Sequence, residues 1–137
     1  MKERVFVDTN VLVYADDLDA GDKTQRARAL LAQLFREQSG VLSTQVLQEF
    51  FAVTTRKLHV DPAIARRKVE LLAKLDVVSI QVPHILHAID LHRLHSVSFW
   101  DALILACAAA AGCARVWTED LQHGANIAGV RIENPFV

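Results

Sequence analysis

Short runs of β-branched and aromatic residues alternate with longer helical segments along this chain of 137 residues. The runs lie at 5–7, 41–42, 77–82, 115–118 and 130–132. Capping residues and apolar residues at helical spacing predict helices over about 22–38, 44–58, 61–75, 84–95 and 98–112. Because strands separated by helical crossovers pair in parallel, this alternation predicts an α/β fold, a three-layer α/β/α sandwich around a central, mainly parallel sheet.

The length and composition of the chain predict one globular domain over residues 1–137. Hydrophobic residues make up 52% and charged residues 23%, which argues against a disordered chain. With only Cys107 and Cys113 as cysteines, we expect buried free thiols in a reducing cytosol. The first residues lack the pattern of a signal peptide, and the longest apolar run, 102–111, is far shorter than the roughly 20 residues that span a bilayer. These features predict a cytoplasmic protein that does not enter a membrane.

Four of the sixteen acidic residues occupy unusual places in this pattern. Asp8 and Asp120 each follow a predicted strand, and open α/β sheets bind ligands at the carboxyl ends of their strands. Asp101 is the only charged residue from 94 to 114, at the start of a helix that is apolar on nearly all sides. Glu49 falls on the rim of the apolar arc of its predicted helix.

Each of these positions also has an ordinary structural explanation. Asp8 could close a turn on its own backbone, and Asp120 could belong to the start of a helix. Asp101 could form a capping box with Ser98, and Glu49 could be a boundary residue whose carboxylate reaches solvent. The capping box would explain why an aspartate stands at position 101. It would not explain why no other charged residue lies nearby in the sequence.

Taken together, the four carboxylates can converge at one edge of a parallel sheet. Close carboxylates repel and raise one another's pKa, so such a group persists at neutral pH mainly by binding hard cations. Mg²⁺ or Mn²⁺ held by carboxylates suits in-line attack of a metal-activated water on a phosphodiester. The pattern therefore predicts a metal-dependent hydrolase of phosphodiester bonds.

Four segments in this order resemble the PIN-domain ribonucleases, and most of all the VapC-type toxins of bacterial toxin–antitoxin pairs. They are Val-Asp-Thr-Asn-Val-Leu-Val-Tyr at 7–14, Glu49, Phe-Trp-Asp-Ala-Leu-Ile at 99–104 and Thr-Glu-Asp at 118–120. Their acidic residues are separated by 41, 52 and 19 positions. One such segment occurs by chance in many proteins, whereas all four in order, over nearly the whole chain, form a specific signal.

The resemblance implies that four acidic residues bind Mg²⁺ or Mn²⁺: Asp8, Glu49, Asp101 and Asp120. Asp8 and Asp101 match the primary metal ligands of the family. Asp120 would support a metal directly or through water, and Glu49 would hold a second metal or orient the attacking water.

Three further residues lie in or beside the matching segments. Asn10 and Thr118 match positions that support the site by hydrogen bonding. Glu119 adjoins Asp120, and the family spacing Thr-x-Asp favours Asp120 as the residue that serves the metal.

As an activity, the resemblance implies endonucleolytic cleavage of RNA by the toxin of a toxin–antitoxin pair. It also implies a homodimer and a cognate antitoxin whose tail occupies the active-site groove. Although the net charge is −1, residues 23–75 carry ten basic and four acidic side chains, so the helices there are candidates for contacts with the RNA backbone. A solvated helical face is the alternative for any one of these side chains.

Two other functions stay open at this point. One is an aspartyl-phosphate phosphatase or phosphotransferase with Asp8 as the covalent nucleophile. The haloacid-dehalogenase-like pattern, however, has a second aspartate where this chain has Asn10. The other is a catalytically inactive PIN-like domain that binds RNA or protein, a class that usually lacks some of the acidic residues present here.

The spacing of the histidines is only a weak indication of a zinc site. His84, His87, His92 and His95 have helical spacing, but they share their stretch with Leu, Ile and Val, and we do not expect them to bind zinc. His123 lies closer to the predicted site and could contact a phosphate group or lie exposed on a loop.

Overall fold

Six strands form the central sheet of the computed structural model, which describes residues 3–137. They are β1 (Val5–Val7), β2 (Gly40–Ser43), β3 (Asp76–Val78), β4 (Arg115–Trp117), β5 (Asn126–Ile127) and β6 (Val130–Glu133). Their order across the sheet is β3-β2-β1-β4-β6-β5. All neighbouring pairs are parallel except β5 with β6, so the prediction of a mainly parallel sheet is confirmed.

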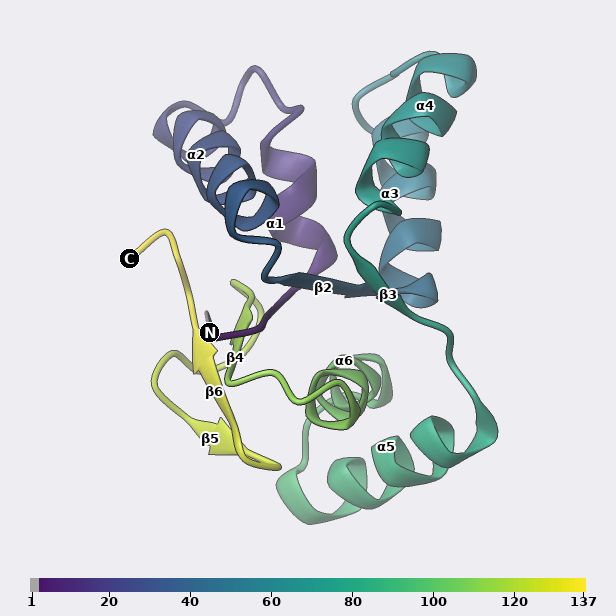
Figure 1. The fold of residues 1–137 in the computed structure, drawn as a ribbon, viewed down its shortest axis with the longest axis vertical. Helices are drawn as coiled ribbons and strands as arrows, with labels where there is room; N and C mark the ends of the chain where they lie inside the picture. The colour runs from purple at the N-terminus through teal and green to yellow at the C-terminus, as the bar shows by residue number, and fades with distance from the viewer. Residues whose placement is uncertain (1–2) are drawn as a thin grey trace.

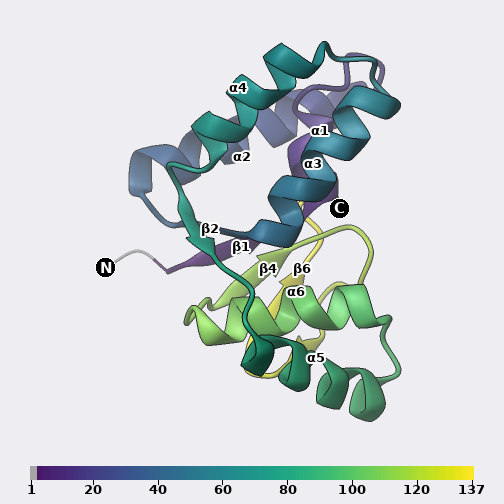
Figure 2. The same cartoon turned by 90° about the vertical axis from the view of Figure 1, so that its right-hand side faces the viewer.

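Helices cover both faces of this sheet (Figures 1 and 2). They are α1 (Thr9–Tyr14), α2 (Asp22–Glu37), α3 (Thr44–Arg56), α4 (Pro62–Leu72), α5 (Val82–His95) and α6 (Phe99–Ala110). Helices α1 to α4 lie on one side of the sheet, and α5 and α6 lie on the other (Figure 2). The predicted three-layer sandwich is therefore confirmed.

The centre of the sheet is fully buried, which explains the near-continuous apolar sequence of its strands. Every residue of β1 and β2 is buried, as expected for strands covered by helices on both faces. Helix α6 is buried from Ala102 to Ala108, and Asp101 lies in its first turn. Within residues 3–137, no helix combines the length and the apolar character needed to cross a bilayer.

Three central strands bring their carboxyl ends to the same edge of the sheet. Strand β1 lies between β2 and β4 and is parallel to both. Helix α1 follows β1 after a single residue, Asp8, and α3 follows β2 directly. The edge at which β1 and β4 end therefore gathers Asp8, Thr118 and the start of α3.

One helix was not predicted, and one strand was predicted with the wrong end. Residues Thr9 to Tyr14 form helix α1, which has six residues and is too short to give a periodic signal. Strand β3 ends at Val78, although a strand over 77–82 was expected, and α5 begins at Val82. Pro83 lacks a backbone N–H and therefore suits the first turn of a helix better than a strand.

Candidate metal centre

Strand pairing places Asp8 beside Thr118. Val7 and Trp117 are partners in the register of β1 and β4, so the next residue of each strand lies at the same edge. The Asp8 N–H donates to the carbonyl oxygen of Trp117 over 3.0 Å. Thr118 Oγ1 donates to Asp8 Oδ2 over 2.7 Å, and both residues are buried. Asp8 is thus fixed by its strand and by a neighbouring side chain.

Asp8 is also the N-cap of α1. Its Oδ1 accepts a hydrogen bond of 2.7 Å from the backbone N–H of Thr9. The Asp8 side chain does fold back on its own backbone, as the ordinary explanation has it, but it caps a helix where that explanation had a turn. It uses one carboxylate oxygen, and the other oxygen accepts from Thr118.

Asp101 and Asp120 reach the same place from distant parts of the chain. Asp8, Asp101 and Asp120 each offer one carboxylate oxygen, and these oxygens all lie within 4.8 Å of one another. Asp8 is buried, Asp101 is half-buried and Asp120 is exposed, so the group opens to solvent on one side. The Ser98 hydroxyl accepts from the backbone N–H of Asp101 over 3.1 Å, so the capping role of Ser98 coexists with this cluster.

Glu49 lies at the flank of this group rather than within it. Its Oε2 accepts a hydrogen bond of 2.9 Å from Thr9 Oγ1, the residue next to Asp8. Its Oε1 accepts one of 2.8 Å from Gln45 Nε2, one turn earlier on α3. These two donors fix the direction of the Glu49 carboxylate. Its charge still acts on the centre, because it raises the pKa of both Asp8 and Asp101.

The two predicted supporting residues join the carboxylates. Asn10 Nδ2 donates to Asp120 Oδ2 over 3.0 Å and lies 3.4 Å from Asp8 Oδ2. Thr118 Oγ1, besides donating to Asp8, accepts from the backbone N–H of Asp120 over 3.1 Å. Asn10 and Thr118 therefore hold Asp8 and Asp120 in a fixed relation.

The pKa shifts reflect burial and like charge. Burial raises the pKa of Asp8 to about 6, even though hydrogen bonds from Thr118 and Thr9 lower it, and the charges of Asp120 and Glu49 raise it further. Burial also raises the pKa of Asp101, with smaller contributions from the same two charges. Such shifts arise where close carboxylates lack a compensating positive charge.

The donor set fits a hard divalent cation. Carboxylate oxygens are the ligands that Mg²⁺ and Mn²⁺ prefer, and two oxygens on opposite sides of Mg²⁺ lie about 4.2 Å apart. Oxygens within 4.8 Å of one another can reach that geometry through small side-chain rotations. In the part of the chain that the structure describes, no histidine or cysteine belongs to a comparable group of three possible ligands.

Comparison with known families agrees with this geometry. Residues 5–126 match the PIN domain. The chain belongs to the PIN domain family. No curated protein matches its sequence.

Solved structures with this PIN fold include several toxin–antitoxin proteins. VapC20 of Mycobacterium tuberculosis, a toxin that cleaves the sarcin–ricin loop, is 20% identical with a TM-score of 0.67, over 85% of this chain and 91% of that one. A toxin–antitoxin complex from Klebsiella pneumoniae is 23% identical with a TM-score of 0.71, over 96% of this chain and 97% of that one. DNA-bound VapBC from Salmonella typhimurium is 19% identical with a TM-score of 0.71, over 98% of this chain and 99% of that one. At these identities the likeness shows a shared fold.

The sequence did not single out Thr9 and Gln45 as part of the site of this PIN domain. Both donate to Glu49, and together they set where its carboxylate points. Gln45 lies four positions before Glu49 on α3, a spacing at which helical side chains meet. That spacing was the available signal for Gln45, whereas Thr9 reaches Glu49 only through the tertiary packing of α1 on α3.

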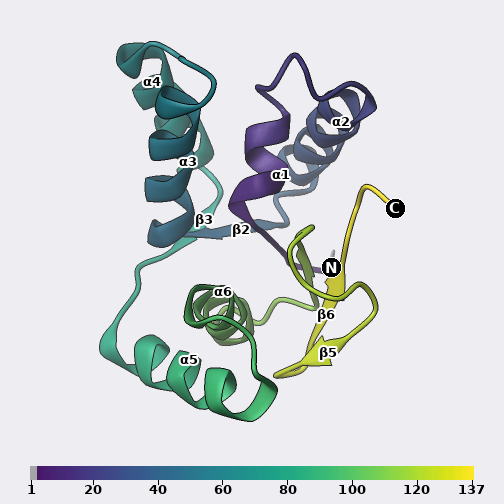
Figure 3. The same cartoon turned by 180° about the vertical axis from the view of Figure 1, so that it is seen from behind.

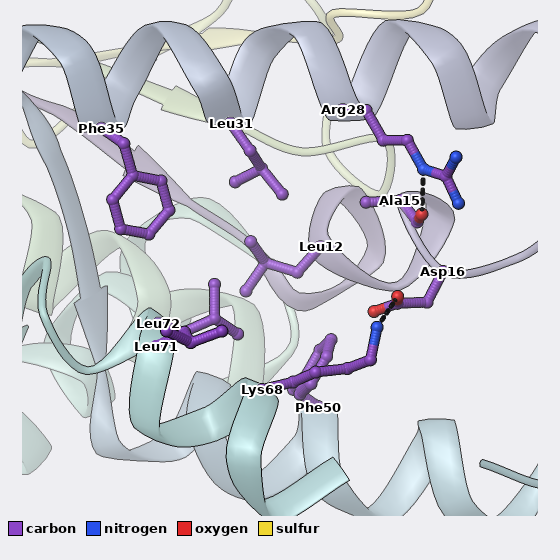
Figure 4. A pocket seen from close by; sticks show the side chains of 10 residues that line it. All are labelled: Leu12, Ala15, Asp16, Arg28, Leu31, Phe35, Phe50, Lys68, Leu71 and Leu72. Carbon is purple, nitrogen blue, oxygen red and sulfur yellow. Dashed lines mark hydrogen bonds and ion pairs between the residues drawn. The ribbon is translucent and has the colours of Figure 1, made fainter. Parts of the chain in front are cut away.

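A second surface feature of this PIN domain is an apolar cleft of about 390 Å³ between α1, α2 and α4 (Figure 4). Its lining consists of Leu12, Ala15, Asp16, Arg28, Leu31, Phe35, Phe50, Lys68, Leu71 and Leu72. Lys68 pairs with Asp16 across the cleft, and Arg28 Nε donates to the carbonyl oxygen of Ala15 over 2.7 Å (Figure 4). Leu71 is 48% exposed there.

Proposed function

We propose that this PIN domain is a Mg²⁺- or Mn²⁺-dependent endoribonuclease that acts as the toxin of a toxin–antitoxin pair. The observation that carries the proposal is the convergence of Asp8, Asp101 and Asp120, which would hold the metal. When bound, the metal supplies an activated water and stabilises the charge that develops on the phosphodiester. No nucleophilic side chain is needed for this chemistry.

The side chains around the metal ligands have distinct roles in this proposal. Asp8 is held in place by Thr118 and Thr9, so it needs little reorganisation when a cation binds. Glu49, directed by Thr9 and Gln45, orients the attacking water, accepts its proton or holds a second metal. Asp120 is exposed and lies where substrate would enter.

The substrate backbone would lie along the basic helices. Several basic side chains of α2, α3, α4 and the turn after α4 are exposed: Arg36, Arg56, Arg67 and Lys74. Lys23 and Lys68 are engaged in ion pairs with Glu119 and Asp16. Phosphate contacts of this kind predict that RNA binding weakens steeply with salt.

The test is RNA cleavage by the purified chain. We expect cleavage with Mg²⁺ or Mn²⁺, none with EDTA, and none in Asp8→Asn, whose folding is checked by circular dichroism. Glu133→Gln is the control, because it removes a half-buried carboxylate that pairs with Arg115. Unchanged cleavage by Asp8→Asn would refute the proposed role of Asp8.

The same preparation separates the alternatives. A catalytically inactive domain should bind no Mn²⁺ in isothermal titration. An aspartyl-phosphate enzyme should trap beryllium fluoride on Asp8, and failure to trap it excludes that mechanism.

We propose that the cognate antitoxin, besides the tail expected in the active-site groove, places an apolar segment in the separate cleft between α1, α2 and α4. The relatives solved as toxin–antitoxin complexes and the exposed apolar lining of the cleft support this partner. The test is co-purification with the product of a small reading frame immediately upstream. Leu71→Glu should abolish co-purification and retain RNA cleavage. Leu94→Glu, at a residue that is 76% exposed on α5, should leave co-purification unchanged.

Self-association is a further part of the proposal. Helix α5 exposes Val82, Ile85, Leu86 and Ile89, which follow one another at helical spacing. Sedimentation velocity should show a dimer that forms through this face of α5. Leu86→Glu should therefore shift the equilibrium from dimer toward monomer. A wild-type chain that sediments as a monomer at every concentration would contradict this part.

A further inference from the structure

Glu119, next to Asp120, is bound by two side chains from outside the metal centre. Its Oε2 pairs with Lys23 Nζ over 2.7 Å, and its Oε1 accepts a hydrogen bond from the Tyr14 hydroxyl. Lys23 Nζ also lies 3.4 Å from the Tyr14 hydroxyl oxygen, so the three side chains form a closed triangle. The Glu119 side chain is 25% exposed, so it is partly shielded from water.

This triangle is anchored on two helices and on the C-terminal segment. The Tyr14 ring meets the Phe136 ring edge-on, with centroids 5.1 Å apart. Lys23 Nζ lies 4.8 Å from the centroid of the Tyr14 ring and 5.6 Å from that of Phe136. The segment that carries Phe136 runs back beside α2, where Arg26 Nε donates to the carbonyl oxygen of Pro135 over 3.1 Å (Figure 3).

The same helix that holds Glu119 also holds Asp120. Asn10 and Tyr14 lie four positions apart on α1 and therefore share a face. Asn10 Oδ1 accepts from the backbone N–H of Glu119 over 3.4 Å, while Asn10 Nδ2 donates to Asp120 Oδ2. Residues 118–120 lie beyond the end of β4 and outside any helix. The Thr118 N–H donates to the Glu133 carbonyl oxygen, whereas the N–H groups of Glu119 and Asp120 donate to side chains.

We propose that Glu119 is a positioning residue, clamped by Tyr14 and Lys23 so that Asp120 keeps its place beside Asp8 and Asp101. This inference rests on the proposed metal-dependent function and concerns the metal affinity of the site. In this clamp the Lys23 ammonium also keeps the Glu119 carboxylate in an ion pair within the chain. A turn held in one conformation loses less conformational freedom when a metal binds, which favours binding.

The direction in which one substitution changes the Mn²⁺ affinity separates a positioning role from simple electrostatics. Lys23→Met removes a positive charge near the site and frees the Glu119 carboxylate, so electrostatics alone predicts tighter Mn²⁺ binding. Loss of positioning predicts weaker binding, by roughly tenfold, as is typical when a partner of a metal ligand is removed. Tyr14→Phe removes only a hydroxyl and should weaken Mn²⁺ binding in the same direction.

The experiment is isothermal titration of the full chain with Mn²⁺, at a temperature where each variant is folded by circular dichroism. Lys23→Arg keeps the ion pair and should restore the wild-type affinity. Glu133→Gln removes a paired carboxylate that is 24% exposed, close to the 25% of Glu119, and should leave the affinity unchanged. In a Glu119→Gln background, Lys23→Met should change the Mn²⁺ affinity little further, because the ion pair is already lost.

Mn²⁺ binding by Lys23→Met that equals or exceeds the wild-type affinity would overturn the proposal. So would a lower melting temperature with an unchanged dissociation constant, because that is the result of a merely stabilising role. If the wild-type chain binds Mn²⁺ and loses binding in Asp8→Asn while Lys23→Met behaves as wild type, only the positioning role fails. If the wild-type chain binds no Mn²⁺, the metal-dependent function fails as well.

Discussion

Thr118 Oγ1 donates a hydrogen bond to Asp8 Oδ2 over 2.7 Å, although 110 positions separate the two residues in the sequence. The same hydroxyl oxygen accepts from the backbone N–H of Asp120. One buried side chain thus links the carboxylate at the end of β1 to the turn after β4 that carries another carboxylate. This bond exists because β1 and β4 are parallel neighbours in register.

Thr118→Val should weaken both folding and metal binding, because valine has nearly the same shape and lacks the hydroxyl. Leaving the buried Asp8 oxygen without this donor should lower the free energy of unfolding by about 1–3 kcal/mol, measured by urea denaturation. Mn²⁺ affinity should fall roughly tenfold in isothermal titration. Thr54→Val is the control, since the buried Thr54 hydroxyl donates to the Phe50 carbonyl oxygen within α3. Equal Mn²⁺ affinity of Thr118→Val and the wild type would contradict the supporting role.

Asp8 should make the metal-free protein less stable as the pH rises. Burial raises its pKa from 3.8 to about 6 on folding, so between these values the folded chain binds more protons than the unfolded chain. Stability from this group is therefore present at low pH and is lost as the pH rises from about 4 through 6. Asp8→Asn removes the effect, and its advantage in unfolding free energy over the wild type should grow by about 2 kcal/mol between pH 4 and pH 7.

Urea denaturation in EDTA measures this difference, and comparing the two proteins at each pH cancels the titration of all other groups. Added Mn²⁺ should then stabilise the wild type and leave Asp8→Asn unchanged. An Asp8→Asn advantage that does not vary with pH would contradict the raised pKa of Asp8.

Glu49→Gln should separate catalysis from metal binding. Glu49 lies outside the group of three oxygens and is held by Thr9 and Gln45, so the first metal should still bind. Cleavage should fall by about 10²-fold or more, the usual loss when a general base is removed. The two measurements are isothermal titration with Mn²⁺ and the initial rate of RNA cleavage. Loss of metal binding together with cleavage would instead make Glu49 a ligand of the first metal.

Cys107 and Cys113 should be unreactive in the folded protein. Both are buried free thiols, as predicted, and burial raises their pKa to about 11 and about 12. The thiolate is the reactive form, so a disulfide reagent such as Ellman's should modify neither residue at pH 8. In urea it should modify both. Fast modification of the folded chain would contradict their burial.

Much of the fold could be predicted from local sequence patterns. The apolar run at 5–7 corresponds to β1, and the helix expected over 61–75 corresponds to α4, with Asp61 as its N-cap and Pro62 as its first residue. Alternation of strands and helices was sufficient to predict parallel pairing, because helical crossovers return each strand in the same direction. Helix α1 and strand β5 were missed, since six and two residues carry too little periodic signal.

The sequence by itself determined the longer helices, the central strands and the carboxylates that lie near the ends of those strands. Asp8 follows β1, Asp101 lies in the first turn of α6 and Asp120 follows Thr118 beyond β4, and the parallel order of the strands brings them together. Only the tertiary structure decided that Glu49 lies at the flank of this group, bound by Thr9 and Gln45. Periodicity reports how one element faces the core, whereas contacts between side chains of different elements depend on packing distances that no local pattern encodes.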